Sequence, residues 1–345
     1  MKEISERLVE RGHEVTVVTA DAGSDVTNRE KRRGVSVHRC RGFAPENAFH
    51  IAPGIIRAVR RAKPDVVHAH NYHSVPMLCA ALATDAPLVV TPHYHGESSS
   101  RIRNHLLRAY RPLGRWALNE ADAIIAVSEW ESRRLEHDFG TTADVIPNGL
   151  RIERFTTAEP VDHSRPYLLC VGRLEEYKGV QHAIRTLTTL PEYDLLVAGS
   201  GSYRSALRRL ARQTGVEEQV KFLGYVAGDR LPGLYAGATA YLLLSEFEAY
   251  GMTVAEALAS GTPCVVRTGS ALDDWLENPG VVPVTDLSPD SITNAISEAR
   301  TSKTGTDRII SWNQVAERIE RSYSSVLTEN RSGACRSERD NEGIV

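Results

Sequence analysis

The sequence predicts an α/β protein with two Rossmann-like, doubly wound parallel-sheet domains that face each other across a cleft. Its 345 residues suit roughly two domains. Short apolar, β-rich runs alternate with amphipathic helical patterns, and strands that are joined by helices form parallel sheets. The alternation is interrupted once, at residues 151–165, which are rich in charge, proline and threonine, and then resumes. We interpret this segment as the linker between the domains.

Composition and charge describe an ordinary globular chain, with 41% hydrophobic residues, 25% charged residues and a formal net charge of −3. Nothing in this balance favours binding of nucleic acid. No apolar run approaches the roughly 18 residues of a membrane-spanning helix, and residues 1–14 form a charged helical pattern unlike a signal peptide. No CxxC pair occurs in the sequence, which predicts a protein of the reducing cytoplasm without disulfides or a zinc site. The five cysteines are Cys40, Cys79, Cys170, Cys264 and Cys335.

The first domain is expected over residues 1–150, and it begins with a helical pattern at 2–11 that no strand precedes. Each crossover helix of a parallel sheet joins two strands, so one strand looks absent and we expect a gap or an exposed edge in this sheet. A polar turn region is expected over 21–33. The other expected strands are 15–19, 35–40, 66–70, 88–91, 123–127 and 144–146, and the helices are 54–62, 74–84, 100–119 and 129–138.

The second domain is expected over residues 166–310. Its expected strands are 167–171, 195–198, 220–223, 240–244 and 264–266, and its helices are 179–190, 202–214, 229–237, 253–260 and 289–302. A last helix, 311–328, is expected to pack back towards the first domain. Residues 329–345 are polar and contain glycine, which predicts a disordered tail.

The stretch 245–261, SEFEAYGMTVAEALASG, holds two carboxylates eight positions apart, Glu248 and Glu256, with Gly251 between them. A strand, a short loop and then a helix present side chains at the carboxyl edge of a parallel sheet, where ligands collect. Glu248 is placed to accept hydrogen bonds from sugar hydroxyls, and Glu256 to hold a ribose diol. An acidic loop in water and a capping box between Thr253 and Glu256 remain open alternatives.

Two cations follow another strand end. Gly172 and Arg173 come directly after the strand, and Lys178 stands just before the next helix. A diphosphate needs close backbone approach and positive charge, which glycine, arginine and lysine supply. Gly199 and Gly201 form a similar strand-to-helix turn. The alternatives are solvated cations and an ordinary turn without a ligand.

Histidines gather at two strand ends of the first domain. His93 and His95 end the run TPHYHG, and His68, His70 and His73 form the cluster HAHNYH. Imidazoles at such an edge are candidate polar groups of a binding site. No acidic or cysteine partner stands in register with the HAHNYH cluster, so we expect no metal site there.

The expected helix 100–119 carries five arginines and no acid between Arg101 and Arg115, with an apolar stripe of Ile102, Leu106, Leu107 and Tyr110. Three interpretations stay open. The helix is a domain helix with its stripe packed on the sheet, it lies on anionic lipid, or it binds a phosphorylated acceptor. In a combined interpretation, Arg101 and Arg103 surround the mouth of an acceptor site.

Taken in order, nine segments resemble the retaining glycosyltransferases of family 4 (glycosyl transferases group 1), which have the GT-B fold. They are RGHEVTVVT, PDVVHAH, TPHYHG, DAIIAVSE, VIPNGL, VGRLEEYKG, LLVAGSGS, VKFLGYV and EAYGMTVAEALASGTPCVV. The resemblance extends from Glu3 to about Leu327. The last segment contains the E-x7-E signature of the family as Glu248 and Glu256.

The resemblance implies roles for the donor side. Arg173 and Lys178 would neutralise the donor diphosphate, Glu248 would hold the transferred sugar, and Glu256 the nucleotide ribose. The backbone of residues Tyr250, Gly251 and Met252 would meet sugar and phosphate.

On the acceptor side, His93 matches the histidine near the reacting centre, with His95 as the alternative. The sequence has no DxD motif, so neither a metal nor another cofactor is implied, and the nucleotide sugar is a substrate.

The function expected from the resemblance is metal-independent transfer of a hexose from a nucleotide sugar to a glycan or lipid-linked glycan, in cell-surface polysaccharide or glycoprotein glycan synthesis. The enzyme would act in the cytoplasm, with peripheral contact to the anionic inner face of the membrane. Family members begin with a strand and a glycine-rich loop, and Met1 falls after both. We therefore expect low stability and little activity from this chain. The alternatives are a nucleotide-sugar epimerase, a phosphorylase and a non-catalytic binding protein.

Overall fold

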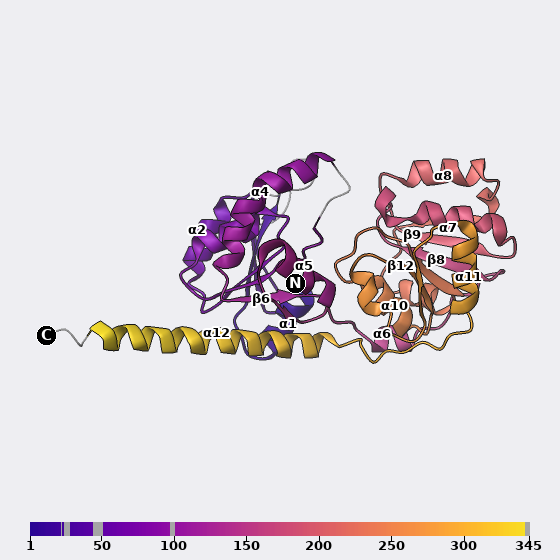
Figure 1. Cartoon of the computed structure of the whole chain (residues 1–345). Coiled ribbons are helices and arrows are strands. Elements are labelled where there is room, and N and C mark those ends of the chain that lie inside the picture. Colours follow the sequence, from indigo (N-terminus) through magenta and orange to yellow (C-terminus); the bar gives the residue numbers. More distant parts are fainter. Residues whose placement is uncertain (22, 24–27, 44–50, 97–100, 342–345) are drawn as a thin grey trace. The chain divides into compact units, whose positions relative to one another are not determined.

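A computed structural model describes residues 1–21, 23, 28–43, 51–96 and 101–341, without the side chains of 101–103 and 331–341. The chain folds into two compact units, each with sheets and flanking helices (Figure 1). Unit 1 comprises Met1–Pro147 and Trp312–Val345, and unit 2 comprises Asn148–Ser311. The predicted α/β class with parallel sheets is confirmed.

Unit 2 contains one six-stranded parallel sheet in the order β10-β9-β8-β11-β12-β13. The chain starts at β8 in the middle, moves outward through β9 and β10, and returns to β11 on the other side. The strand order therefore reverses between β8 and β11, which is where doubly wound sheets bind ligands. The strands are β8 (Tyr167–Val171), β9 (Asp194–Ala198), β10 (Val220–Gly224), β11 (Ala240–Leu243), β12 (Cys264–Arg267) and β13 (Val281–Val284).

The central strands of unit 2 are buried on both faces because helices cover the sheet (Figure 1). Leu168, Leu195, Val197 and Val265 at its centre are fully buried. The helices are α6 (Glu153–Thr156), α7 (Val180–Thr186), α8 (Arg204–Gln213), α9 (Leu231–Ala236), α10 (Met252–Ala259) and α11 (Pro289–Ala299).

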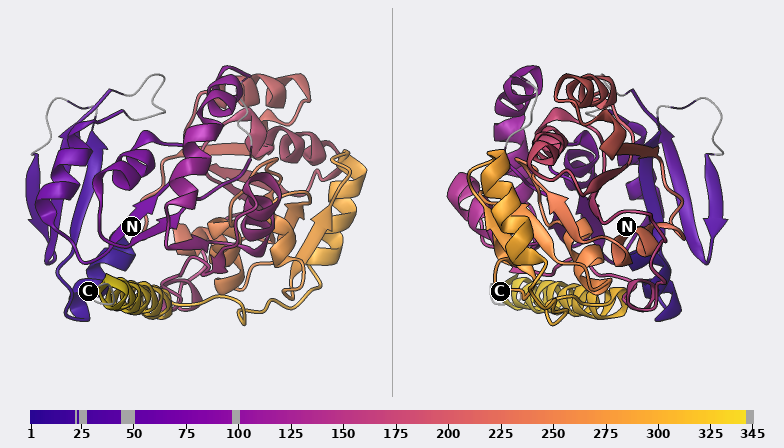
Figure 2. Two further views of the ribbon diagram at one scale, coloured as in Figure 1. Left: turned by 60° about the vertical axis from the view of Figure 1, so that its left-hand side comes forward. Right: turned by 90° about the vertical axis from the view of Figure 1, so that its right-hand side faces the viewer.

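Unit 1 contains two sheets, β1-β3-β2 and the parallel β4-β5-β6-β7. Within the described residues no strand joins β1 to β4, so the expected gap is present, and Figure 2 shows the two groups of strands. The strands are β1 (Thr16–Asp21), β2 (Arg29–Arg32), β3 (Val35–Arg41), β4 (Val67–His70), β5 (Leu88–Thr91), β6 (Ala123–Ala126) and β7 (Asp144–Val145). The helices are α1 (Lys2–Glu10), α2 (Gly54–Ala62), α3 (Val75–Ala83), α4 (Arg101–Asn119), α5 (Glu129–Phe139) and α12 (Trp312–Asn341).

The last helix, α12, belongs to unit 1 and lies along α1 (Figures 1 and 2). Arg11 and His13 both bond to the carboxylate of Glu320. The hydroxyl of Tyr323 lies 2.7 Å from Nδ1 of His68, at the start of the four-stranded sheet. These contacts join the two chain segments that make up unit 1.

Two strands escaped prediction, each for a local reason. The region expected as a polar turn contains β2, whose sequence REKR has no apolar alternation. It pairs antiparallel with β3 at a sheet edge, where charged residues deter further pairing. Strand β13 contains Pro283, which argues against a central strand. It pairs only with β12, so the missing N–H of Pro283 is tolerated at this edge.

Two expectations about connecting segments were wrong. Residues 151–165, expected as a linker, contain α6 and pack on unit 2, where Val161 N–H donates to the Gly233 carbonyl and His163 bonds to Asp194. The tail expected to be disordered from residue 329 continues α12 to Asn341. It contains no proline, which would end a helix, and residues 342–345 lie outside the described residues. The described cysteines are free and buried: Cys40, Cys79, Cys170 and Cys264.

Candidate active site

The strand ends at the reversal point of unit 2 bring together the residues that the sequence singled out. Strand β8 leads into the loop with Gly172, Arg173 and Lys178, and β11 leads into the loop with Glu248. The two strands are hydrogen-bonded neighbours and run parallel. Their carboxyl ends therefore lie at the same edge of the sheet.

Lys178 and Glu248 form an ion pair at this edge, although they are 70 residues apart in the sequence. The ammonium nitrogen donates to a carboxylate oxygen at 2.6 Å, and the two side chains are only 17% and 16% exposed. Such a charge-assisted hydrogen bond is stronger than one between neutral groups. The predicted cation and the predicted carboxylate are thus in direct contact.

Arg173 lies beside Lys178 and is exposed. Its Nη2 donates to the hydroxyl of Tyr177 at 2.8 Å, which holds the long side chain in place. Arg173 and Lys178 line the same pocket, together with Gly172 and Leu174 at the end of β8. Two cations at one hollow can bind an anion that carries more than one charge.

Gly199 and Gly201 let two loops lie against each other. A Cβ on Gly199 would lie 1.8 Å from the Gly172 carbonyl oxygen, and one on Gly201 would lie 2.3 Å from the Leu174 carbonyl oxygen. No other residue fits at either position. Close packing of the loops accounts for both glycines, so the simple structural alternative suffices for them.

Helix α10 begins at Met252 with Gly251 as its N-cap, in the left-handed region at a φ of 90°. The capping-box alternative is excluded, because Thr253 lies inside the helix and cannot be its N-cap. The carbonyl of Tyr250 accepts a hydrogen bond from the indole of Trp275 at 2.5 Å, which fixes the approach to the helix. A helix N-terminus at this edge of the sheet favours an anion.

The Glu256 side chain accepts a hydrogen bond from the Tyr235 hydroxyl at 2.8 Å. Burial raises the pKa of Glu256, while this hydrogen bond and the charge of Arg154 act to lower it. Sequence reasoning missed Tyr235 on α9 and Arg154 on α6. Neither lies in a recognisable motif, and Arg154 falls in the segment that was interpreted as a linker.

In unit 1 the predicted histidines form two ring clusters. His70 lies between His68 and His93, with ring centroids 4.2 Å and 5.6 Å away. Burial lowers the pKa of His68 to about 3, of His93 to about 4, and that of His70 well below its usual value. His93 has a φ of 48°, which is uncommon for a residue other than glycine and found at functional sites.

The second cluster is His73 stacked on His95 at 4.2 Å. Burial lowers the pKa of His73 to about 3. The side chains of Arg101 and Arg103 lie outside the described residues. Within the part that is described, no group of three or more histidine, cysteine or acidic side chains could hold a metal ion.

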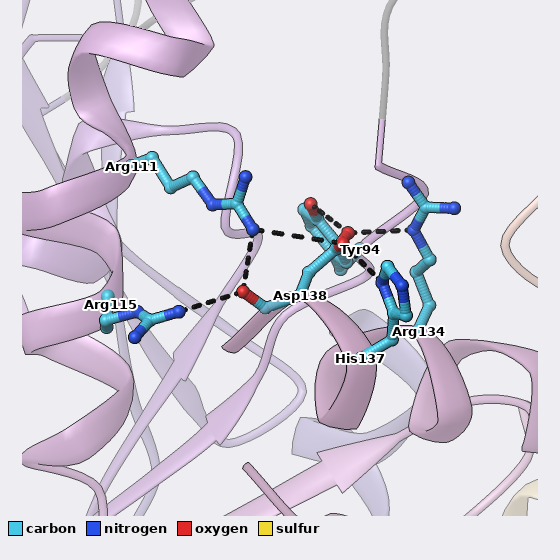
Figure 3. Close-up of polar contacts among 6 residues, drawn as sticks. All are labelled: Tyr94, Arg111, Arg115, Arg134, His137 and Asp138. Atoms are coloured by element: carbon cyan, nitrogen blue, oxygen red, sulfur yellow. Dashed lines mark hydrogen bonds and ion pairs between the residues drawn. The ribbon is translucent and has the colours of Figure 1, made fainter. Parts of the chain in front are cut away.

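Asp138 is the centre of a polar cluster that includes Tyr94, from the loop that contains His93 and His95 (Figure 3). Its carboxylate accepts hydrogen bonds from the Tyr94 hydroxyl and from Arg134, both at 2.8 Å. Burial acts to raise the pKa of Asp138, but hydrogen bonds from His137, Tyr94 and Arg134 outweigh it and the net shift is downward. Tyr94 stands between His93 and His95, so the cluster ties their loop to α5.

Glu131 of α5 also holds the loop that contains His93 and His95. Its fully buried carboxylate accepts from the backbone N–H groups of Tyr94 and Val127, at 2.5 Å and 2.7 Å. Burial raises its pKa to about 7. Sequence reasoning missed Asp138 and Glu131, since both read as ordinary charges of a surface helix.

Comparison with known proteins identifies the chain. Residues 1–154 match the family described as Glycosyltransferase Family 4, and residues 152–310 match Glycosyl transferases group 1. A glycogen synthase of Mycobacterium tuberculosis (strain H37Rv) is 30% identical over 309 residues, which are 80% of this chain and 75% of that protein. The chain belongs to this glycosyltransferase family. The resemblance of the sequence segments is thereby confirmed, and this glycosyltransferase is an enzyme of the GT-B type.

Solved structures agree on the fold. Sucrose-phosphate synthase from Thermosynechococcus elongatus superposes with a TM-score of 0.79 at 19% identity, covering 95% of this chain and 92% of that one. The Anabaena protein Alr3699/HepE, solved with UDP-glucose, superposes with a TM-score of 0.69 at 18% identity, covering 90% and 99%. No helix among the described residues of this glycosyltransferase is long and apolar enough to cross a membrane.

Proposed function

We propose that this glycosyltransferase moves a sugar from a nucleotide-sugar donor, bound at the β8–β11 edge of unit 2, with retention of configuration. The observation that carries the proposal is the Lys178–Glu248 pair beside Arg173. A sugar diphosphate needs cations at one end and a hydrogen-bond acceptor for hydroxyls at the other. Without donor the lysine and the carboxylate neutralise each other, and with donor each has a ligand group to bind.

The proposed roles follow from what each group offers. Arg173 and Lys178 bind the diphosphate and stabilise the negative charge that it gains as the leaving group. Glu248 accepts hydrogen bonds from hydroxyls of the transferred sugar. The N-terminus of α10, reached through Tyr250, Gly251 and Met252, faces the phosphate and sugar with backbone N–H groups.

Glu256 is proposed to hold the ribose of the nucleotide. Its carboxylate is half-buried and already accepts one hydrogen bond from Tyr235. The second carboxylate oxygen can accept from a ribose hydroxyl, as acidic residues do in other nucleotide folds. Gly199 and Gly201 would serve the donor by keeping the neighbouring loop close to Gly172.

The reaction is proposed as a displacement on one face of the sugar. The bond between the anomeric carbon and the phosphate oxygen breaks, and its electron pair stays on the diphosphate. The acceptor hydroxyl forms the new bond from the same face and passes its proton to a donor phosphate oxygen. Arginine, lysine and the helix N-terminus supply the positive charge in this scheme, so no metal ion takes part.

On the acceptor side we propose His93 and His95, with Arg101 and Arg103 near the entrance. His93 is neutral at physiological pH, because its pKa is lowered to about 4. It is therefore suited to hydrogen bonding with hydroxyls and not to binding charge. The proposed acceptor is a glycan or a lipid-linked glycan of cell-surface or glycoprotein synthesis. The proposed location is the cytoplasm, with peripheral contact to an anionic membrane.

A second candidate is a binding protein without turnover, and the gap between β1 and β4 is the observation that favours it. An open sheet can leave unit 1 too loose to present an acceptor. In that case the donor site of unit 2 would still bind. Calorimetry with nucleotide sugars, followed by a turnover assay on the same preparation, separates the two candidates.

The test uses a panel of labelled nucleotide sugars with the purified chain and glycan acceptors. We expect one donor to bind and to be consumed, a product with the anomeric configuration of the donor, and full activity in EDTA. Glu248→Gln should abolish transfer while the fold is kept. Unchanged turnover in Glu248→Gln, or an inverted product, would overturn the proposed mechanism.

A further inference from the structure

Tyr177 lies in the short helical turn η2 (Glu176–Lys178) of unit 2 and contacts both cations of the proposed donor site. Its hydroxyl accepts a hydrogen bond from Nη2 of Arg173 at 2.8 Å. The ammonium nitrogen of Lys178 lies over the face of its ring, 5.2 Å from the centroid. A cation within about 6 Å of an aromatic face is attracted by the ring. One tyrosine therefore holds both cations that line the pocket at the end of β8.

The backbone around Tyr177 is fixed by contacts between two loops. Its carbonyl oxygen accepts a hydrogen bond from the N–H of Glu246 at 2.8 Å, which joins the loop after β8 to the loop after β11. A Cβ on Gly179 would clash with the carbonyl oxygen of Leu244, so the same loops also touch there. These backbone contacts do not involve the Tyr177 side chain, and a substitution of that side chain leaves the two loops joined.

The partner that orients Arg173 is neutral. Among the residues that the structure describes, no carboxylate forms an ion pair with Arg173. The nearby Glu175 accepts from the hydroxyl of Ser202 at 3.1 Å, and Glu248 accepts from Lys178. A carboxylate partner would neutralise the guanidinium, whereas a hydroxyl orients it and leaves its charge available. Arg173 is thus held in place with its full charge.

Holding a long side chain in advance makes binding more favourable. A mobile arginine or lysine loses rotamer freedom when it binds a ligand, which lowers affinity by about two- to tenfold for each such side chain. The hydrogen bond and the ring contact impose this order before a ligand binds. Arg173 is exposed and Tyr177 is half-buried, so the hydrogen bond between them adds little to the stability of unit 2.

We propose that Tyr177 is a positioning residue of the donor site, whose hydroxyl orients Arg173 and whose ring holds Lys178 for one diphosphate group. The proposal rests on the proposed function, because the ligand that needs both cations is the diphosphate of a nucleotide sugar. When the donor separates Lys178 from Glu248, the ring of Tyr177 is the contact that stays with the lysine. Tyr177 acts through the two cations and takes no part in the reaction itself.

The test measures binding of inorganic pyrophosphate, UDP, GDP and ADP to the full chain by calorimetry in metal-free buffer. Pyrophosphate has neither base nor sugar, so its binding reports on the cations alone. Tyr177→Phe removes the hydroxyl and keeps the ring, and it should weaken binding about two- to tenfold at an unchanged urea midpoint. Tyr177→Leu also removes the ring and should weaken binding by a further two- to fivefold, roughly.

Combination with variants of the cations shows through which group each part of Tyr177 acts. In an Arg173→Gln background, Tyr177→Phe should cause no further loss, because the hydroxyl then has no guanidinium to orient. In a Lys178→Met background, the additional loss of Tyr177→Leu over Tyr177→Phe should disappear. A side chain that only supports the fold would weaken binding by the same factor in every background.

Tyr193→Phe is the matched control. The Tyr193 hydroxyl also accepts a hydrogen bond from an arginine of unit 2, Arg300, at 3.5 Å. Tyr193 directly precedes β9, so it lies at the amino ends of the parallel strands, opposite to the donor site. Its substitution should leave binding of all four ligands unchanged.

Three results would overturn the positioning role while the donor site stands. They are wild-type affinity in Tyr177→Phe, a loss of equal size in the Arg173→Gln background, and an equal loss in Tyr193→Phe. If the wild-type chain binds none of the four ligands, the donor site and the positioning role fail together. The two kinds of failure are therefore recognised separately.

Discussion

The Lys178–Glu248 pair makes the sharpest prediction, because its two charges should be coupled before any substrate binds. Both side chains are about five-sixths buried, from the 17% and 16% exposed fractions, and the contact is 2.6 Å long. Exposed pairs contribute about 0.2–1 kcal/mol, and hydrogen bonds to charged groups contribute about 1.5–3 kcal/mol. For this largely buried pair we expect a coupling free energy of about 1–2 kcal/mol.

A double-mutant cycle measures that coupling. Lys178→Met, Glu248→Gln and the double variant are unfolded in urea, and the coupling is the difference between the double change and the sum of the single changes. The losses of stability in the two single variants should together exceed the loss in the double variant, because each single variant leaves one charge without its partner. Arg308→Gln and Glu277→Gln form a matched control cycle in the same unit. Their side chains are 49% and 74% exposed, so coupling below about 0.5 kcal/mol is expected.

The same variants connect the pair to catalysis. If Lys178 stabilises the leaving diphosphate, Lys178→Met should lower kcat by about 10²–10³-fold, as the loss of one transition-state contact does elsewhere. A coupling no larger than that of the control cycle would show that the contact contributes nothing to the fold. Normal turnover of a well-folded Lys178→Met variant would refute the role in catalysis.

Three further predictions concern single residues. Glu131 has its pKa raised from 4.5 to about 7 by burial, so the folded state binds a proton that the unfolded state has released, and stability should fall as pH rises from about 4.5 to 7. In Glu131→Gln the urea concentration at the midpoint of unfolding should depend less on pH across that range. The same pH dependence as in the wild type would contradict this account. His68 has the opposite sign: burial lowers its pKa from 6.5 to about 3, so stability should be lost as pH falls through this window, and the loss should be smaller in His68→Gln. Gly251→Ala places a Cβ 2.8 Å from Leu272 at a φ of 90°. It should lower the free energy of unfolding by about 1–3 kcal/mol and weaken donor binding. Gly261→Ala, at a φ of 80° with open space, should cost only the backbone strain and leave calorimetric donor binding intact.

Most strands of both units could be predicted, because a parallel sheet buries both faces and leaves continuous apolar runs in the sequence. The strand β2 could not be, since REKR has no apolar residue and exists as a strand only through pairing with β3. The proline in β13 conceals a strand whose position at the sheet edge makes that proline harmless. These two elements depend on their place in the sheet, which a local pattern does not encode.

The proposed donor site was also only partly predictable from the sequence. Lys178 and Glu248 could be named from residue type and motif, but their direct contact depends on β8 and β11 being neighbours. From sequence spacing alone, Glu256 could either bind a ligand or form a capping box with Thr253. The left-handed Gly251 decides where α10 begins, and with it that Glu256 lies beyond the first turn. Tyr235 and Arg154 reach Glu256 from elements that carry no motif at all.

The protonation of unit 1 limits where the charge for the reaction can come from. Burial lowers the pKa values of His68 and His73 to about 3, that of His93 to about 4, and that of His70 well below its usual value. These imidazoles are neutral at physiological pH, so they offer hydrogen bonds to hydroxyls and no positive charge to a diphosphate. In the proposed reaction the charge that neutralises the leaving group is therefore assigned to Arg173, Lys178 and the N-terminus of α10 in unit 2. For this reason we expect that replacing Arg173 or Lys178 by a neutral residue weakens donor binding far more than replacing any one of these histidines does, when both are measured by calorimetry.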